Sequence, residues 1–216
     1  MAARCTLANE ELLRAAGFLR IAGIDEAGRG PLAGPVVVAA VILPQGFSHP
    51  RLNDSKKLSE KLRDQIYADL VGDPRLISAV TIIEPEEIDR LNILRATHEG
   101  MRRAVLQLPA AADHALIDGL PVHPFPIAQT ALVGGDGLSL SIAAASVLAK
   151  VTRDRLMLEL DLQFPQFGFA KHKGYGTALH LARLREYGPS PAHRRSFAPV
   201  RQLVLPLQTA LYGAPA

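Results

Sequence analysis

The stretch GIDEAGRGPLAGPV, residues 23–36, contains the end of one apolar segment, RIAGID at 20–25, and the start of another, VVVAAVIL at 36–43. Both segments predict β-strands, and the second is apolar enough to be buried on both faces of a sheet. Only about ten residues of glycine- and proline-rich loop connect them, which is short for a helical crossover. We therefore expect the two strands to form an antiparallel pair.

The rest of the chain alternates helical and strand patterns around this pair. Further strands are predicted at 75–83, 114–118 and 127–133, and helices at 9–17, 59–72, 85–108 with a break near Asn92, 139–164 and 177–188. Ser59 and Gly188 stand where residues of these types begin and end helices. These elements predict an α/β or α+β domain, with a mixed sheet of about five strands and helices on both faces.

The composition is that of an ordinary globular protein. A chain of 216 residues suits one domain, and its 48% of apolar residues can form a core. The single cysteine, Cys5, excludes an internal disulfide and favours a reducing compartment. No signal-peptide pattern and no run of about 18 apolar residues is present, so we expect a cytoplasmic protein without a membrane span. The net charge of +3 permits binding to a polyanion but does not require it.

Two carboxylates, Asp25 and Asp118, close predicted strands, and each follows an apolar run. If those strands are neighbours, the two side chains lie at the same edge of one sheet, where α/β folds place their sites. For either residue alone, a turn that hydrogen-bonds its own backbone is an equally good explanation.

A third carboxylate, Asp154, falls within the predicted helix at 139–164, on the apolar stripe formed by Val147, Val151 and Leu158. A carboxylate on a buried face is unfavourable unless a cation compensates it. Lys150, one turn earlier, offers a simple ion pair, and a divalent metal shared with the two strand-end acids is the functional alternative.

Oxygen ligands without a nearby Cys or His pair disfavour zinc and favour Mg²⁺ or Mn²⁺. Such ions typically serve phosphoryl transfer, and two of them about 3.5–4 Å apart can hold the attacking water and stabilise the leaving oxygen. Glu26 raises a difficulty, because adjacent side chains on a regular strand point to opposite faces. We therefore expect the strand to break at Glu26 if it joins Asp25 in one site.

Six blocks of the sequence, in order over roughly residues 20–200, resemble bacterial ribonuclease HII, the type 2 ribonuclease H. They are GIDEAGRGPLAGPVVVAAVIL, DSKKLS (54–59), LIDG (116–119), SLSIAAASVLAKVTRDR (139–155), KGYGT (173–177) and GPSPAHRRSFAPV (188–200). One local departure is VGGDGLS (133–139), where Gly135 and Gly137 replace a lysine and an alanine that are more frequent in the family. This departure affects the expected shape of one loop.

The resemblance implies a ribonuclease H-like fold with a catalytic core at 1–164 and a small helical substrate-binding segment at 165–216. It implies an endonuclease that cuts RNA in RNA–DNA hybrids and at single ribonucleotides embedded in duplex DNA, leaving 5′-phosphate and 3′-hydroxyl ends. It also implies dependence on Mn²⁺ or Mg²⁺, with two ions when substrate is bound. No obligate protein partner is evident, so we expect a monomer.

The resemblance also assigns residues. The four catalytic and metal-binding acids fall on Asp25, Glu26, Asp118 and Asp154. Gly28, Arg29 and Gly30 form the element that tests for a ribose 2′-hydroxyl, where glycine lets the backbone approach the sugar. Tyr175, between two glycines, is expected to be exposed and to stack on the sugar of the deoxynucleotide that follows the ribonucleotide.

The basic residues of the matched blocks have two readings, phosphate contacts or ordinary surface charges; they are Lys56, Lys150, Lys173, Arg194 and Arg195. Two other functions remain open at this point. A resolvase or transposase of the same fold would share the acids and the metal, and a catalytically silent protein would only bind hybrids. Cleavage that requires a ribonucleotide separates the first from a ribonuclease H, and turnover with Mn²⁺ excludes the second.

Overall fold

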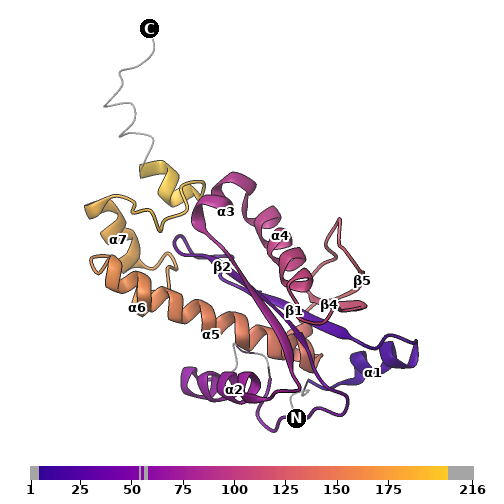
Figure 1. The fold of residues 1–216 in the computed structure, drawn as a ribbon. Coiled ribbons are helices and arrows are strands. Elements are labelled where there is room, and N and C mark those ends of the chain that lie inside the picture. The colour runs from indigo at the N-terminus through magenta and orange to yellow at the C-terminus, as the bar shows by residue number, and fades with distance from the viewer. Residues whose placement is uncertain (1–4, 54, 56–57, 204–216) are drawn as a thin grey trace. The chain divides into compact units, whose positions relative to one another are not determined.

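The structure, a computed structural model, describes residues 5–53, 55 and 58–203 (Figure 1). Lys56, one of the residues with a predicted phosphate contact, lies outside the described residues. The chain divides into two compact units. The first comprises Met1–Ala27, Val37–Ile82 and Thr97–Thr152, and the second comprises Gly28–Val36, Ile83–Ala96 and Arg153–Ala216.

A five-stranded mixed sheet is the centre of the first unit, as the sequence predicted. Its strands are β1 (Ile21–Ala27), β2 (Val36–Ile42), β3 (Ile77–Ile83), β4 (His114–Asp118) and β5 (Ala128–Leu132), in the order β3-β2-β1-β4-β5. The β1 and β2 strands pair antiparallel, which confirms the argument from the short loop. β1 pairs with β4, and β4 with β5, in parallel. Every residue of β2 is buried, which explains its unbroken apolar sequence.

The helices also follow the sequence closely. They are α1 (Ala8–Ala15), α2 (Glu60–Gly72), α3 (Pro85–Leu91), α4 (Ile93–Leu106), α5 (Leu140–Gln163), α6 (Phe169–His172) and α7 (Ala178–Tyr187). The Ser59 side chain caps α2, and Gly188 ends α7 with a positive φ of 70°. Asn92, with φ 68°, separates α3 from α4, which confirms the predicted break. The short α6 was not predicted, because four residues carry too little periodicity.

The N-terminus of α5 packs directly on β1. A Cβ atom built on Gly23 would lie 2.1 Å from the Ser141 carbonyl carbon, so the helix backbone rests where a side chain would be. Glu10 of α1, which is buried, accepts hydrogen bonds from Ser139 Oγ at 2.6 Å and from Ser141 N at 2.9 Å. A carboxylate at a helix N-terminus satisfies free N–H groups and opposes the positive end of the helix dipole. Glu10 and Gly23 therefore fix the start of α5 against the sheet.

The second unit has its own apolar clusters. One contains Ala33, Met157, Phe167, Phe169 and Ala192, and another is built around Leu32, Leu184 and Val200. Both draw on the loop that follows β1 and on the C-terminal third of the chain, so segments far apart in sequence form one core. Among the described residues, no helix is both long and apolar enough to cross a bilayer.

Candidate metal centre and recognition loops

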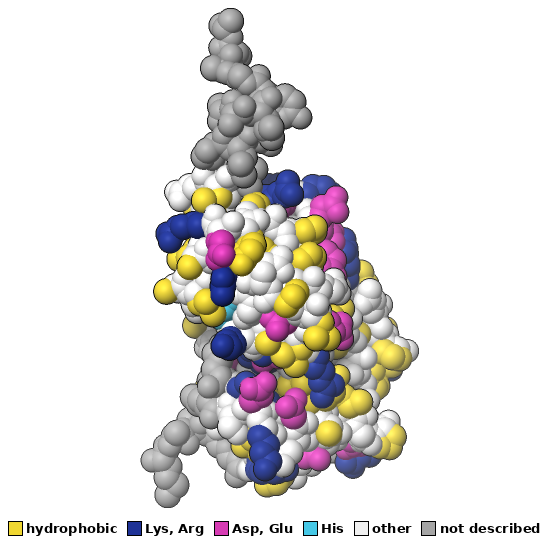
Figure 2. All heavy atoms as spheres, turned by 90° about the vertical axis from the view of Figure 1, so that its left-hand side faces the viewer, with side chains coloured by type: hydrophobic (Ala, Val, Ile, Leu, Met, Phe, Trp, Pro, Cys, Tyr) yellow, Lys and Arg dark blue, Asp and Glu magenta, His cyan; other side chains and the backbone are white. Residues whose placement is uncertain are grey.

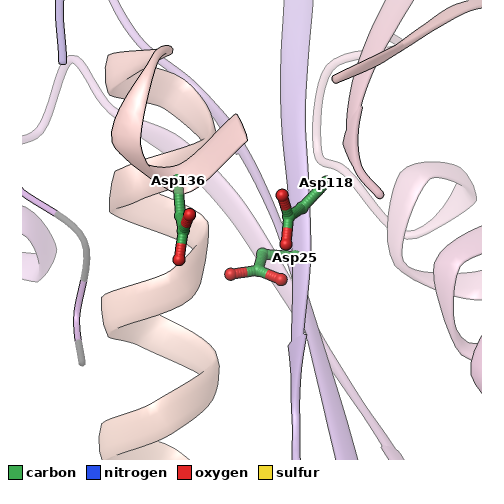
Figure 3. A group of neighbouring side chains, drawn as sticks. All are labelled: Asp25, Asp118 and Asp136. Atoms are coloured by element: carbon green, nitrogen blue, oxygen red, sulfur yellow. The ribbon is translucent and has the colours of Figure 1, made fainter. Parts of the chain in front are cut away.

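Three aspartates of the first unit converge on one point (Figure 3). Asp25 belongs to β1, Asp118 ends β4, and Asp136 lies in the 3₁₀ turn Gly135–Gly137 that precedes α5. One carboxylate oxygen from each lies within 4.8 Å of those of the other two. Asp25 and Asp136 are buried and Asp118 is partly buried. This arrangement is a compact, all-oxygen group suited to a divalent cation.

The parallel register of β1 and β4 brings the first two acids together. Ile24 pairs with Ile117, so the next residues along the two strands, Asp25 and Asp118, lie side by side. This confirms the expectation that the two strands are neighbours and that their terminal carboxylates share one edge of the sheet.

Sequence reasoning missed Asp136. This acid, between Gly135 and Gly137 in the segment 133–139, is 4% exposed. Gly135 N donates a 2.7 Å hydrogen bond to Asp118 Oδ1, which holds the turn against the end of β4. A usable signal was present, because an acid between two glycines follows the strand that neighbours β4. Only the tertiary pairing of β4 with β5 gives that signal its meaning.

Asp25 has a pKa well above its usual value, and the causes are local. Burial raises the pKa most, and the negative charges of Glu26 and Asp118 raise it further. A hydrogen bond from the Ser146 side chain and one from the Glu26 backbone N–H, at 2.7 Å, partly offset this rise. Buried carboxylates that repel one another in this way bind a cation favourably, because the cation relieves the repulsion. The donor set therefore fits a hard divalent ion.

Glu26 corrects one expectation. The β1 strand does not break there, since it continues to Ala27 and Glu26 pairs with Val38 of β2. On a regular strand, the side chains of Asp25 and Glu26 point to opposite faces. Glu26 is not one of the three converging acids, although its charge raises the pKa of Asp25. Its role as a metal ligand stays a prediction.

Asp154 lies on α5 and belongs to the second unit. Its side chain is 8% exposed, which agrees with the predicted burial of this helix position. The apolar stripe is shorter than predicted, because Val147 and Val151 are buried whereas Leu158 is 44% exposed. Participation of Asp154 in a metal site stays a prediction.

The glycine-rich loop after β1, residues 28–35, belongs to the second unit, and Gly28 adopts a φ of 98°. A Cβ at Gly28 would lie 2.0 Å from Arg153 Nε, so the glycine is required by packing within the protein as well as by any approach of substrate. Gly30 differs, because the nearest atom to its Cβ position would be Tyr175 Cε1 at 3.6 Å. Gly30 is exposed, and a Cβ there would meet only the Tyr175 ring, at an ordinary contact distance. Arg29 lies between these two glycines, and its carbonyl oxygen accepts a hydrogen bond from Arg194 Nη1 at 3.0 Å.

Tyr175 is 49% exposed, as its flanking glycines predicted. Those glycines also have a packing role. A Cβ at Gly174, whose φ is 83°, would lie 2.4 Å from the Ala33 carbonyl oxygen, and one at Gly176 would lie 3.2 Å from Leu32 Cδ1. The loop that carries Tyr175 is therefore packed tightly against the loop at 28–35.

Three buried histidines support the tyrosine loop through a chain of hydrogen bonds. Ser190 N donates to His193 Nδ1, so His193 must carry its proton on Nε2 and donate it to His180 Nε2, 3.0 Å away. His180 then donates from Nδ1 to the Tyr175 carbonyl oxygen at 2.9 Å. His172 accepts at Nδ1 from Gly174 N. The chain requires neutral imidazoles, because a second proton would place two N–H groups face to face.

We expect acid to destabilise the second unit through these histidines. Burial and the charge of His180 lower the pKa of His193 from 6.5 to about 3, and burial lowers that of His180. Between the lowered pKa values of the folded state and the ordinary value of 6.5, the unfolded chain binds more protons than the folded one. The contribution of these histidines to the free energy of unfolding is therefore fully present above pH 6.5 and is lost as the pH falls below it. Thermal unfolding at a series of pH values should show this slope, and His193→Gln should flatten it. The exposed His123 provides the control, since His123→Gln should leave the slope unchanged.

The basic residues with predicted phosphate contacts occupy different environments. Arg194 is 0% exposed, so both readings of this residue, a phosphate contact and an ordinary surface charge, are wrong. Lys173 is partly buried and its Nζ donates to the Ala170 carbonyl oxygen at 2.6 Å. Arg195 is exposed, and its backbone N–H donates to Asp89. Figure 2 shows that Lys and Arg side chains are interspersed with acidic and apolar ones on the face in view.

Comparison with known proteins gives a consistent result. A protein-family model described as Ribonuclease HII matches residues 22–200. The Ribonuclease HII of Chlamydia pneumoniae is 51% identical over 197 residues, which cover 91% of this chain and 92% of that protein. The crystal structure of ribonuclease H2 from Pyrococcus horikoshii OT3 matches with a TM-score of 0.74 and 25% identity, over 88% of this chain and 99% of that one. Bst-RNase HIII in complex with Mn²⁺ matches with a TM-score of 0.65 over 87% of this chain and 70% of that one, and its 18% identity shows the fold alone.

Proposed function

This chain belongs to the ribonuclease HII family of metal-dependent endoribonucleases that act on RNA–DNA hybrids, and from that premise we propose that it also cuts at single ribonucleotides embedded in duplex DNA. The products would carry 5′-phosphate and 3′-hydroxyl ends. Convergence of Asp25, Asp118 and Asp136 is the observation that carries the catalytic part of the proposal. The resolvase and hybrid-binding alternatives are not favoured by the family match.

In this proposal Asp25, Asp118 and Asp136 hold a divalent ion, and Glu26 and Asp154 complete the set. Mn²⁺ or Mg²⁺ bound there supplies Lewis-acid activation of the scissile phosphate and of the attacking water. The protein keeps Asp25 oriented through the hydrogen bond from Ser146. It keeps Asp118 oriented through Gly135 N. The raised pKa of Asp25 supports the assignment, because strongly perturbed carboxyls cluster at functional sites.

The proposal places substrate recognition on Gly28, Arg29, Gly30 and Tyr175. The exposure of Gly30, beside the Tyr175 ring, supports an approach of the sugar to the loop backbone there, where a 2′-hydroxyl can be hydrogen-bonded. The half-exposed ring of Tyr175 supports stacking on a sugar or base.

Cleavage of three matched duplexes tests the proposal. One duplex contains a single ribonucleotide, the second pairs a continuous RNA strand with DNA, and the third is DNA only. With Mn²⁺ or Mg²⁺ we expect cleavage of the first two, with 5′-phosphate and 3′-hydroxyl ends. Cleavage of the all-DNA duplex at a comparable rate would instead support a nuclease of the resolvase type.

We expect Tyr175→Ala to lower kcat/KM on the single-ribonucleotide duplex by about tenfold to a hundredfold, because stacking by one aromatic ring is worth roughly 1–3 kcal/mol. The continuous hybrid should be affected less, since a junction with DNA is not its only target. Tyr175→Phe retains the ring and serves as the control. Equal losses on both substrates would show that this residue does not read the junction.

A further inference from the structure

Two buried arginines of the second unit lie beneath the recognition loops. Arg153 of α5 is 1% exposed and Arg194 is 0% exposed, and they are the largest of its fully buried side chains. We call this pair the arginine bracket. Arginine is rarely buried so completely, and a buried guanidinium requires most of its five donors to be satisfied.

Arg194 binds the loop at 28–35 through main-chain oxygens. Its Nη2 donates to the Gly28 carbonyl at 2.6 Å, its Nη1 to the Arg29 carbonyl at 3.0 Å, and its Nε to the Gly34 carbonyl at 2.9 Å. A second bond from Nη2 to Gly34 measures 2.8 Å. One side chain therefore closes the loop by joining its beginning to its end.

Arg153 joins that loop to the tyrosine loop. Its Nε donates to the Pro35 carbonyl at 3.0 Å, and its Nη2 donates both to Ala33 at 3.2 Å and to Lys173 at 3.0 Å. Lys173 lies two residues before Tyr175. A backbone bond from Leu32 N to the Gly174 carbonyl, at 2.8 Å, adds a second link.

We infer that Arg153 and Arg194 are positioning residues that hold residues 28–35 and 173–176 as one rigid element, so that the ribose-reading backbone and the Tyr175 ring keep a set spacing. The inference rests on the proposed function for the roles of the two loops. It goes beyond that function because neither arginine reaches substrate; both act through the main chain that they bind.

The chemistry requires arginine at both positions. A guanidinium presents five donors in a planar fork and reaches several carbonyls at once, whereas an ammonium is a single point with three donors on a flexible stem. Burial lowers the pKa of Arg153 to about 10 and that of Arg194 to about 9, so both remain charged at neutral pH. Lysine would keep the charge and lose the geometry, which makes it the informative substitution.

Kinetics on two substrates test the consequence for recognition. Arg194→Lys and Arg153→Lys should lower kcat/KM on the single-ribonucleotide duplex by about tenfold or more, since each loses several hydrogen bonds. The loss on a continuous hybrid should be about threefold or less, because that substrate depends less on the spacing of the two loops. Arg185→Lys, the same change at an exposed position of α7, should alter neither value. Equal losses on both substrates would overturn the inference.

A fluorescence measurement tests the coupling without relying on catalysis. The chain contains no tryptophan, so Tyr175→Trp introduces a sole reporter in the second loop. With either bracket arginine changed to lysine, we expect about a twofold rise in the acrylamide quenching constant, as the loop opens locally. If the acrylamide quenching constant is unchanged in folded variants, the inference is overturned, regardless of the kinetic results on the two substrates. If Arg194→Lys fails to fold, as thermal unfolding would reveal, Arg153→Lys carries the test because it loses fewer bonds. If the protein does not cleave the substrates but quenching increases in the arginine variants, the proposed function is rejected, whereas the positioning role of the arginine bracket is retained.

Discussion

Asp25→Asn is expected to lower the cleavage rate by about three orders of magnitude or more while leaving the protein folded. The change removes a negative ligand from the group formed with Asp118 and Asp136, and metal-assisted charge stabilisation contributes several kcal/mol to such reactions. Single-turnover cleavage of the one-ribonucleotide duplex at saturating Mn²⁺ measures the effect. Near-normal turnover at a matched metal concentration would remove Asp25 from the catalytic assignment.

The same variant should be more stable than the parent protein when no metal is present at neutral pH. Because the folded state raises the pKa of Asp25, it binds a proton more readily than the unfolded state does. Stability from this group is therefore complete below its usual pKa of 3.8 and is lost as the pH rises through the raised value. Asparagine removes that loss, so the gain in Tm should shrink as the pH falls toward 3.8.

Glu159→Gln provides the matched control, since it neutralises an exposed acid of α5. It should change neither turnover nor the pH dependence of Tm. A drop in the apo Tm of Asp25→Asn at neutral pH would mean that the carboxylate is a structural partner whose charge the fold requires.

Gly23→Ala is expected to destabilise the first unit by about 3 kcal/mol, at the upper end of overpacking effects. The added Cβ would lie 2.1 Å from the Ser141 carbonyl carbon and 2.3 Å from Ile142 N. These are backbone atoms at the start of α5, which Glu10 also holds, so the contact cannot be relieved by a rotamer change. For a chain of this size the loss corresponds to roughly 6–12 °C in Tm.

The metal centre should respond as well. Gly23 and Asp25 are two residues apart on β1 and therefore face the same side of the sheet. On that side α5 carries Ser146, whose side chain hydrogen-bonds Asp25. Displacing α5 should weaken the apparent affinity for Mn²⁺ in the folded fraction of Gly23→Ala. Gly72→Ala, at the end of α2 with nothing within 4 Å of its Cβ position, is the control and should leave Tm and metal affinity unchanged. A wild-type Tm for Gly23→Ala would show that α5 is not seated on β1 through this contact.

Much of this molecule was predictable because the signals are local. The short loop between 20–25 and 36–43 required an antiparallel pair, and the unbroken apolar sequence of β2 required burial on both faces. Helix boundaries at Ser59, Asn92 and Gly188 follow from capping and backbone preferences of single residues. Apolar runs that end in acids identified Asp25 and Asp118 for the same reason.

Other features depended on pairings between distant segments, which no local pattern encodes. Asp136 joins the acids only because β5 pairs with β4 and returns the following turn to the same edge of the sheet. Arg194 reads as a surface cation among HRRS, yet the fold buries it against carbonyls of the loop at 28–35, more than 150 residues earlier. Position 28 must be glycine because the Arg153 side chain occupies the space that a Cβ atom would need.

The sequence by itself therefore determined the elements, the mixed sheet and the two strand-end acids, because turn length, periodicity and capping act over a few residues. The tertiary structure decided that Asp136 is the third acid and that positions 23 and 28 must be glycine. It also decided that Arg153 and Arg194 are buried and bind the main chain of the loops at 28–35 and 173–176. Those properties depend on close packing and hydrogen bonding between segments far apart in the chain, and such contacts exist only after the chain has folded.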